Sequence, residues 1–408
     1  MMVERRQVVV IGAGPSGSIA AALLRQRGRD VLVLERQKFP RFSIGESLLV
    51  HCLDFVAEAG MLEAVDAAGF QYKNGAAFAR GSKYSDYDFG QRFAPGRPST
   101  FQVTRATFDK LLADEAARQG VEIRYEVEIV GSDETGGRRT LTARSVDGDV
   151  RTIEADFVLD ASGFGRSLPK LLNLEVPSNF PARQAMVTHV TDRIAVGAFD
   201  RNKVRVTVHP VHHDVWYWLI PLANGRSSVG VVATKEFLDR YPGPSEQRLR
   251  TLLAEDRGLA SLLVDAEWDT PVREIGGYAA NVKTMHGPGF ALLGNAAEFL
   301  DPVFSSGITI AMRSSSMAVQ VLDRQLRGER VDWQSEFEEP LRRGVDCFRA
   351  YVEAWYDGRF QKIVFHERQP EDLKKMICSV LAGYAWDERN PFVTQARARL
   401  DTLAKLCA

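Results

Sequence analysis

The chain has 408 residues with 52 basic and 53 acidic side chains, and this length predicts more than one structural unit with room to bury a large cofactor. The formal net charge of −1 argues against a nucleic-acid partner, and the four scattered cysteines argue against both a disulfide framework and a metal site. Because neither a secretory signal nor a long apolar run is visible, the sequence also predicts a cytoplasmic protein without a membrane partner.

The first predicted elements are a strand, a glycine-rich turn and a helix. Residues 7–11 are mostly β-branched and predict a strand, residues 19–26 follow a helical pattern, and between them lies the turn Gly12-Ala13-Gly14-Pro15-Ser16-Gly17. A second strand, residues 31–34, is followed by Glu35, where a dinucleotide site needs an acidic partner for its ribose. Gly12 permits the tight turn, Gly14 admits a pyrophosphate, and Gly17 lets the helix pack closely on the strand. The pattern predicts dinucleotide binding, with a plain tight turn as the alternative.

The rest of the chain predicts a nucleotide-binding domain that is interrupted by a second unit. Polar and apolar residues alternate in the middle of the chain, which is typical of an antiparallel sheet with one covered face, and the pattern becomes helical beyond residue 331. We therefore assign residues 1–180 to the first part of the nucleotide-binding domain, with an inserted substrate-site segment at about 78–102, residues 181–271 to an antiparallel substrate sheet, residues 272–330 to the second part of the nucleotide-binding domain, and residues 331–408 to a C-terminal helical region.

Three stretches resemble the distributed flavin site of the aromatic hydroxylase and geranylgeranyl reductase superfamily. They are Val103-Thr104-Arg105-Ala106-Thr107-Phe108-Asp109, Asp160-Ala161-Ser162-Gly163, and Leu293-Gly294-Asn295-Ala296-Ala297 ahead of Asp301-Pro302. The resemblance implies FAD as the cofactor and places Arg105 at its phosphate and ribityl region, although a lone arginine is more often a solvated surface cation. Asn295 departs from the superfamily's Gly-Asp pair. Its amide keeps an acceptor oxygen but adds donors and loses the charge, which changes the hydrogen bonding available to the ribityl chain.

Four further stretches, in the same order along the chain, resemble the flavin-dependent halogenases. They are residues 39–47 (FPRFSIGES), residues 70–78 (FQYKNGAAF), residues 216–221 (WYWLIP) and residues 299–307 (FLDPVFSSG). The third matches the family's Trp-x-Trp-x-Ile-Pro pattern, which by itself is more often a buried aromatic strand. Within this family the chain is similar to the shorter enzymes that act on pyrrole or phenol rings tethered to a carrier protein.

The halogenase resemblance assigns catalysis to Lys73 and Glu46. It implies that reduced FAD and oxygen convert chloride or bromide into hypohalous acid. Lys73 then holds this oxidant by a hydrogen bond, or carries it as a haloamine, so that the halogen reaches one aromatic carbon. Glu46 is either an acid or base near Lys73 or a structural residue of its loop. A lysine outside such a motif is usually a solvated charge.

The same resemblance assigns binding and shielding residues. Backbone N–H groups at the turn Ser305-Ser306-Gly307 are predicted to bind the halide, aided by the dipole of the helix that begins near Ile308. The indoles of Trp216 and Trp218, with Phe304, are predicted to keep the substrate away from the flavin. The predicted cofactor-binding residues are Gly12, Ala13, Gly14, Ser16, Gly17, Glu35, Arg36, Arg41, Ile44, Arg105, Asn295, Asp301, Gly307 and Ile308.

The predicted fold is α/β: a glutathione-reductase-like Rossmann domain that binds FAD, interleaved with an antiparallel substrate sheet and followed by helices. The resemblance implies an FADH2-dependent halogenase of secondary metabolism, such as antibiotic biosynthesis. Its substrate would be a small aromatic ring on an acyl or peptidyl carrier protein. Because only one glycine fingerprint is present, a partner flavin reductase must supply the reduced FAD. The alternatives are a flavin monooxygenase or geranylgeranyl-reductase-like oxidoreductase, a halogenase of a free small aromatic, and a flavoprotein that only binds. The oligomeric state stays open.

Overall fold

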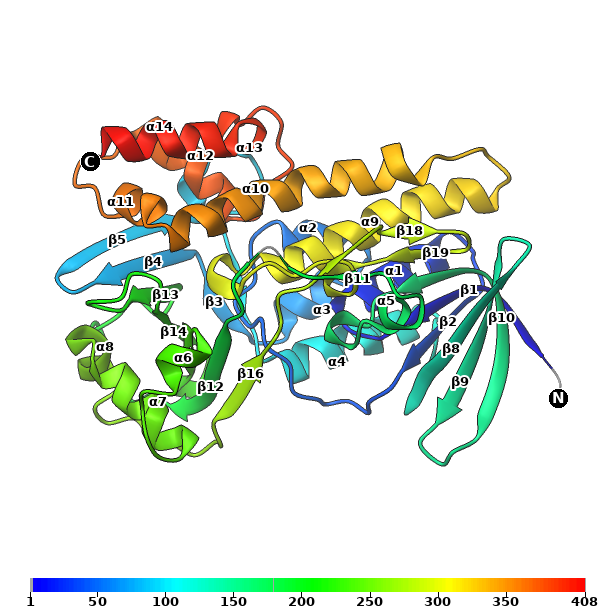
Figure 1. The fold of residues 1–408 in the computed structure, drawn as a ribbon, viewed down its shortest axis with the longest axis horizontal. Helices are drawn as coiled ribbons and strands as arrows, with labels where there is room; N and C mark the ends of the chain where they lie inside the picture. The colour runs from blue at the N-terminus through cyan, green and yellow to red at the C-terminus, as the bar shows by residue number, and fades with distance from the viewer. Residues whose placement is uncertain (1–2, 179, 408) are drawn as a thin grey trace.

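Two large β-sheets, of eight and seven strands, organise the protein and lie toward opposite ends of its long axis (Figure 1). The computed structural model describes residues 3–178 and 180–407. Long helices run between and above the sheets, and the two termini lie at opposite ends of the molecule. The predicted α/β class, with both parallel and antiparallel pairing and a C-terminal helical region, is confirmed.

The first sheet has a parallel centre that is apolar on both faces. Its main path runs β18-β19-β10-β1-β2-β7, and the pairs from β19 to β7 are parallel. Val8, Val9 and Val10 are fully buried because helices cover the sheet. The strands are β1 (Glu4–Ile11), β2 (Val31–Glu35), β7 (Glu122–Tyr125), β8 (Val127–Thr135), β9 (Arg138–Ser145), β10 (Val150–Asp160), β18 (His286–Gly287) and β19 (Phe290–Leu292).

Helices surround this sheet, and the first of them is longer than the sequence pattern predicted. The first helix starts at Pro15, earlier than residue 19, because proline at the first helical position needs no N–H partner. Ser16 in this helix hydrogen-bonds Ser315 of the long helix α9 at 2.8 Å, which ties the glycine turn to the second half of the domain. These helices are α1 (Pro15–Gln26), α2 (Cys52–Glu58), α3 (Leu62–Ala67), α4 (Arg105–Arg118), α5 (Ser167–Leu171) and α9 (Ser306–Leu326).

The second sheet is mainly antiparallel and collects strands from three parts of the chain. Its order is β16-β12-β15-β14-β13-β4-β5, and only the β13–β4 pair is parallel. The strands are β4 (Gly75–Arg80), β5 (Lys83–Asp88), β12 (Gln184–Thr191), β13 (Lys203–Val208), β14 (Trp216–Pro221), β15 (Arg226–Ala233) and β16 (Arg273–Gly276). One face packs on a separate apolar cluster with α6 (Lys235–Leu238), α7 (Ser245–Ala254) and α8 (Arg257–Leu262). On the other face, Phe78 of β4 packs against Trp355, and Trp216 of β14 donates to the hydroxyl of Tyr356, so helices of the C-terminal region cover part of it.

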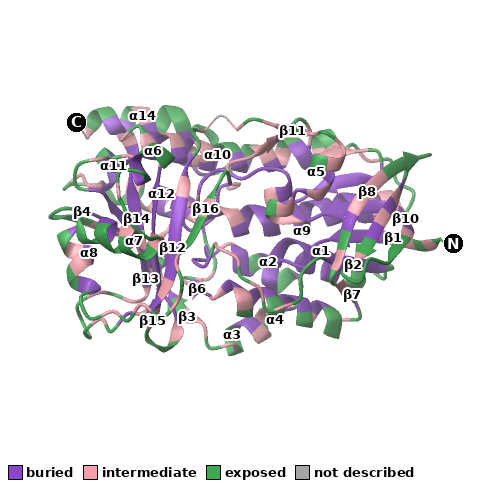
Figure 2. Cartoon of the chain, turned by 60° about the horizontal axis from the view of Figure 1, so that its bottom comes forward, coloured by how far each residue is buried: buried purple, intermediate pink, exposed green. Residues whose placement is uncertain are grey.

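Helices of the C-terminal region lie over the β4–β5 end of the second sheet, and α10 extends from there toward the first sheet (Figure 1). They are α10 (Glu339–Tyr356), α11 (Arg359–Val364), α12 (Glu371–Leu381), α13 (Pro391–Thr394) and α14 (Ala396–Leu406). Figure 2 shows the strands of both sheets largely buried, whereas the outer turns of α14 are exposed. Two small two-stranded sheets complete the described strands: β3 (Gln71–Lys73) pairs with β6 (Thr100–Gln102), and β11 (Glu175–Val176) pairs with β17 (Asn281–Val282). Within residues 3–178 and 180–407, none of the helices combines the length and apolar composition needed to cross a bilayer.

Candidate functional site

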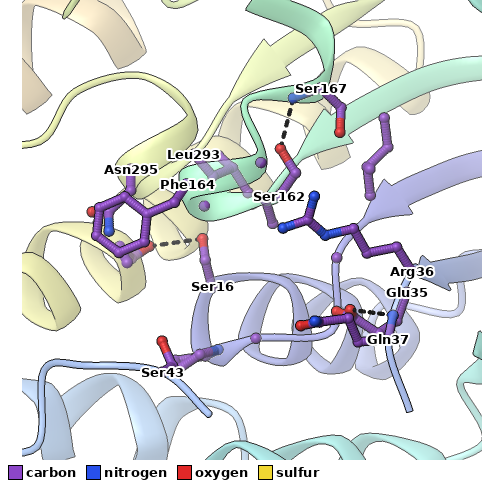
Figure 3. A pocket seen from close by; sticks show the side chains of 18 of the residues that line it. Ser16, Glu35, Arg36, Gln37, Ser43, Ser162, Phe164, Ser167, Leu293 and Asn295 are labelled. Carbon is purple, nitrogen blue, oxygen red and sulfur yellow. Dashed lines mark hydrogen bonds between the residues drawn. The ribbon is translucent and has the colours of Figure 1, made fainter. Parts of the chain in front are cut away.

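A cavity of about 360 Å³ opens at the ends of β1 and β2, above the glycine turn. Figure 3 shows Glu35 and Arg36 on one side of this cavity and Phe164 and Asn295 on the other. Its lining includes Gly12, Gly14, Pro15, Ser16, Glu35, Arg36, Arg41, Arg105, Ser162, Phe164, Asn295, Gly307 and Ile308. Segments from both parts of the nucleotide-binding domain therefore meet around one space.

Glycine is required twice in the turn for steric reasons. Gly12 has a φ of +97°, and a Cβ there would lie 2.7 Å from the carbonyl oxygen of Ala161. A Cβ on Gly17 would lie 1.8 Å from the carbonyl oxygen of Gly12. Glu35 holds the turn from below, because its Oε2 accepts the N–H of Ala13 at 2.9 Å. Ala13 and Gly17 thus shape the turn without lining the cavity.

A buried carboxylate fixes two arginines at the cavity wall. Asp109, which is fully buried, accepts hydrogen bonds from Nε and Nη2 of Arg105 at 2.7 and 2.9 Å and lies 3.2 Å from Arg41. Arg105 also donates to the carbonyl of Ile44. Arg105 is only 7% exposed, so the alternative of a solvated surface cation is wrong. A planar guanidinium held on two sides is suited to binding an anionic or polar group in a fixed orientation.

A second cavity, of about 90 Å³, adjoins the first and is mostly apolar. The two cavities share Arg105, Phe164, Asn295, Gly307 and Ile308. The remaining lining comes from the second sheet and from the segments 44–47 and 299–305. It comprises Ile44, Gly45, Glu46, Ser47, Ala185, Val187, Val204, Val206, Trp216, Trp218, Ile220, Phe299, Pro302, Val303 and Ser305. We call this second, apolar cavity the chamber, and the first cavity, above the glycine turn, the cradle. The chamber lies directly beside the cradle.

The two indoles form one wall of this chamber, and each is fixed through its N–H. Trp216 donates to the hydroxyl of Tyr356 at 3.0 Å, and Trp218 donates to Ser228 at 3.1 Å. Their ring centroids are 5.9 Å apart. Gly230 on the neighbouring strand makes room for Trp218, since a Cβ there would lie 2.3 Å from the indole. The Trp pair is therefore a rigid wall.

Two residues of the 299–307 stretch point away from the chamber. The hydroxyl of Tyr356 donates to Asp301 at 2.7 Å, and Phe304 packs edge-on against Trp355. Neither Asp301 nor Phe304 is among the lining residues of the two cavities. Burial raises the pKa of Asp301 to about 6, although the hydrogen bond from Tyr356 acts in the opposite direction. The stretch thus connects the chamber to α10 through a chain of hydrogen bonds from Trp216 to Asp301.

Replacing Tyr356 with phenylalanine is expected to destabilise the protein by about 1–3 kcal/mol, because the buried N–H of Trp216 and the carboxylate of Asp301 each lose a partner. The folded-state pKa of Asp301 is raised, so the carboxylate is charged and needs its donor only above about pH 6. The decrease in the free energy of unfolding, measured by urea denaturation, should therefore be larger at pH 8 than at pH 5. Tyr351→Phe is the control. Its hydroxyl is buried and has no hydrogen-bond partner among the described residues, so its removal should cost little at either pH.

Lys73 lies in a closed position behind the chamber. Its side chain is fully buried, and its Nζ donates to the carbonyl of Leu48 at 2.7 Å and lies 5.2 Å from the centroid of the Phe89 ring. Burial lowers the pKa of Lys73 to about 7. Lys73 lines neither of the two cavities, but Leu48 directly follows Glu46 and Ser47, which line the chamber. The lysine and the chamber therefore contact neighbouring residues of one short segment.

The sequence did not single out His189, which forms a close pair with Glu46. The Nε2 of His189 and the Oε1 of Glu46 are 2.6 Å apart. The available signal was the alternation of residues 185, 187 and 189, which places His189 on the face of β12 that carries two chamber residues. Nothing in the sequence indicated that Glu46, 143 residues away, would lie against this face and pair with His189.

Most of the predicted binding and shielding residues converge on the two cavities. Those that line one or both are Gly12, Gly14, Ser16, Glu35, Arg36, Arg41, Ile44, Glu46, Arg105, Trp216, Trp218, Asn295, Ser305, Gly307 and Ile308. Those outside the lining are Ala13, Gly17, Lys73, Asp301, Phe304 and Ser306.

Comparison with known proteins finds a flavin-binding domain family, halogenases and a flavoprotein among the matches. The model of the FAD binding domain family matches residues 5–339. Tryptophan 2-halogenase of Chondromyces crocatus is 32% identical over 86% of this chain and 66% of its own length, so the chain spans just under two thirds of that enzyme. The 1H-pyrrole-2-carbonyl-[peptidyl-carrier protein] chlorinase of Pseudomonas fluorescens is 28% identical over 86% of this chain and 83% of its own. A solved flavoprotein/dehydrogenase from Cytophaga hutchinsonii is 44% identical over 99% of each chain, with a TM-score of 0.96.

The first cavity fits the FAD for which the matching family is named. Gly14 presents bare backbone to the cavity, because, among the described residues beyond its chain neighbours, a Cβ there would come within 4 Å of just one atom, a guanidinium nitrogen of Arg41 at 3.3 Å. A pyrophosphate could therefore approach the start of α1, where backbone N–H groups favour anions. Glu35 would take the ribose, and Arg105 and Asn295 lie where the cradle meets the chamber.

Proposed function

The chain belongs to the flavin-dependent halogenase family, and on this premise we propose that it attaches chlorine or bromine to an electron-rich aromatic ring. One observation carries the proposal. The apolar chamber walled by Trp216 and Trp218 shares Arg105, Asn295 and Gly307 with the FAD cradle. A ring in the chamber would thus lie next to the place where a flavin reacts, with the two indoles on a wall that belongs to the chamber alone.

The bound cofactor supplies, in its reduced form and with oxygen, the oxidising power that turns a halide into hypohalous acid. The chain's own residues provide the surroundings for that step. The turn from Ser305 to Gly307 opens α9, and Ser305 adopts a left-handed conformation with a φ of +57° that directs the backbone into the helix. N–H groups at such a helix start favour a halide ion. Apolar walls keep bulk water out and slow the escape of the oxidant into solvent.

Lys73 would deliver the halogen from its buried position. With a pKa lowered to about 7, a large part of the side chain is an uncharged amine at neutral pH, which can hydrogen-bond hypohalous acid or form a haloamine. One N–H of the neutral amine can stay on the carbonyl of Leu48, while its second N–H or its lone pair meets the oxidant. The Leu48 carbonyl thereby holds the amine in place.

The substrate we propose is a single small ring, pyrrole or phenol, carried on an acyl or peptidyl carrier protein. The chamber of about 90 Å³ suits one ring better than a fused indole bearing an amino-acid group. The carrier-dependent pyrrole chlorinase supports this choice, since the chain spans 83% of its length. The similarity to a tryptophan halogenase keeps a free aromatic substrate as the alternative.

We expect a pyrrole-2-carboxyl or phenol group loaded on a carrier protein to be halogenated at least about 10-fold faster than the free acid, because an extended interface adds binding energy to the small ring. The assay contains wild-type protein, FAD, a flavin reductase and either chloride or bromide, with product detected by mass spectrometry. Equal turnover of the free acid would assign the protein to the enzymes of free substrates. A reaction without carrier but with a free phosphopantetheine thioester separates the effect of the arm from that of the carrier.

A second candidate is a redox flavoprotein that transfers no halogen. Two observations favour it: a solved structure of a flavoprotein/dehydrogenase matches almost the entire chain, and Lys73 lines neither cavity. The two functions differ in halide dependence. Product formation that is unchanged when halide is removed would support the redox function and exclude the halogenase.

A further inference from the structure

We infer that Glu46 and His189 form a proton path that carries the ring proton from the chamber to solvent during halogenation. This inference rests on the proposed function and adds a residue, His189, that no motif identified. His189 acts through Glu46, and it is therefore a positioning and relay residue. Glu46 is the group that faces the ring.

The geometry of the pair fits this role. Glu46 is 4% exposed and lines the chamber, and its Oε1 lies 2.6 Å from Nε2 of His189. The side chain of His189 is 22% exposed, so the pair extends from a closed apolar space to the protein surface. Ala185 and Val187 precede His189 on the same face of β12 and line the same chamber. The strand thus places His189 on the face that carries two chamber residues, beside Glu46 and outside the chamber lining.

The path also borders the aromatic wall. His189 is paired across the sheet with Ser228, whose hydroxyl accepts the N–H of Trp218. His189 of β12 thus holds Glu46, and Ser228 of the adjacent strand β15 holds the indole of Trp218. Trp218 and Glu46 both line the chamber that would hold the ring.

The chemistry requires such an exit. The ring carbon bonds to the halogen of hypohalous acid while the halogen–oxygen bond breaks, and both electrons of that bond leave with oxygen as hydroxide. The hydroxide becomes water by taking a proton from solvent. The ring C–H bond then breaks, its electrons restore aromaticity, and its proton must return to solvent for the reaction to balance. In an apolar chamber the proton needs an acceptor, which Glu46 provides; His189 receives it at Nε2 and releases one from Nδ1.

Burial and the charged groups around His189 determine the pH range in which its imidazole is neutral and can accept a proton. Burial lowers the pKa of His189, but the hydrogen bond to Glu46 and the charge of that carboxylate raise it more, whereas the nearby charges of Arg226 and Arg273 lower it. The net pKa is raised. The relay needs neutral imidazole, so halogen transfer should decline as the pH falls through this raised pKa and be fully active above it.

The test is His189→Gln, which retains an N–H donor for Glu46 but cannot relay a proton. We expect halogenated product to form about 10-fold more slowly or worse, since a positioned proton acceptor contributes about 10²–10⁴-fold to such steps. The part of the acid limb that reports His189 should disappear, and the part that reports protonation of the Lys73 amine should remain. Ring-deuterated pyrrole-2-carboxyl substrate, free or carrier-loaded, should react more slowly than the protonated form in the variant but not in wild type.

His209→Gln is the matched control, because His209 and Glu255 form a pair of the same 2.6 Å length outside the chamber. It should keep the wild-type rate and pH profile. A His189→Gln enzyme with the wild-type rate, pH profile and isotope response would overturn the inference. Wild-type protein that forms no halogenated product contradicts the proposed function instead.

A second measurement needs neither flavin nor substrate. Titration of the His189 ring protons by NMR should give a pKa above that of a free histidine, and Glu46→Gln should lower it. If His189 titrates like a free histidine, or does not respond to Glu46→Gln, the two residues are not coupled and the proton path is wrong. This result is independent of whether the enzyme halogenates.

Discussion

Lys73→Met forms halogenated product at least about 100-fold more slowly than wild type, while the oxidation of reduced FAD continues at an unchanged rate; this is the result we expect from deleting a group that orients the reacting species. The FAD cradle and the halide turn do not contact Lys73, so oxidant formation should survive. Flavin absorbance and product mass, followed in the same reaction, separate the two steps. A variant that halogenates near the wild-type rate would remove Lys73 from the mechanism and favour the redox function.

The same substitution should make the protein more stable. Lys73 is fully buried, and within the described chain it has no carboxylate partner, so burial lowers its pKa from 10.5 to about 7. Each pKa unit corresponds to about 1.4 kcal/mol, so keeping the ammonium in the core costs about 5 kcal/mol at neutral pH. Between pH 7 and 10 the unfolded chain binds more protons at this group than the native one, so wild-type stability should rise with pH. Lys73→Met should be more stable at pH 7 and lack this rise.

Lys203→Met is the control for the stability measurement. Lys203 is also largely buried, but its Nζ lies 2.8 Å from Asp200, and this contact helps to raise its pKa. Its replacement should therefore lower the stability and leave halogenation intact. If both lysine variants lose stability equally, the buried amine of Lys73 is not strained by its surroundings.

Gly14→Val is expected to weaken FAD binding by about 5-fold to 150-fold, because one side chain forced into an occupied space costs about 1–3 kcal/mol. The substitution is selective. Gly14 has φ −68° and ψ −176°, which any residue can adopt, and its Cβ would meet only the flexible end of Arg41. The cofactor-free protein should thus melt near the wild-type temperature, while FAD titration, followed by flavin fluorescence, should show the loss.

Gly276→Val serves as the comparison for Gly14. A Cβ at Gly276 would meet the flexible side chain of Gln184 at 3.1 Å, which is a similar local contact in β16, far along the chain from the cradle. We expect its FAD affinity to be unchanged. Equal FAD affinity of Gly14→Val and wild type would show that the pyrophosphate does not lie over this turn.

The sequence predicted the local parts of the fold well, because each is specified by neighbouring residues. The strand, turn and helix from Glu4 to Gln26 follow from β-branched residues, glycines and a proline that act within a few positions of one another. The same holds for the strand that carries Trp216 and Trp218. The directions of side chains in a contiguous motif were harder to predict. The short helical turn at Pro302 sends Val303 into the chamber and Phe304 toward α10.

The partners of buried polar groups could not be predicted at all. Glu46 pairs with His189, Asp301 with Tyr356, and Lys73 with a backbone carbonyl, and each of the two side-chain pairs joins residues far apart in the chain. Periodicity indicates which face of a strand is covered but carries no information on which distant residue covers it. These contacts depend on how the two sheets meet, so only the folded chain reveals them.

The parallel pairing of β13 with β4 has a consequence for synthesis on the ribosome. Gly75 lies beside Lys203 in the sheet, so the early β4–β5 hairpin has no lasting neighbour until the strand at residues 203–208 has left the exit tunnel. Closing such a distant pair is slow, and the waiting edge is exposed meanwhile. Truncation at residue 180 therefore leaves a hairpin without its sheet, and a fragment that starts at residue 181 lacks an edge. Neither half should be expressible as a well-behaved separate protein.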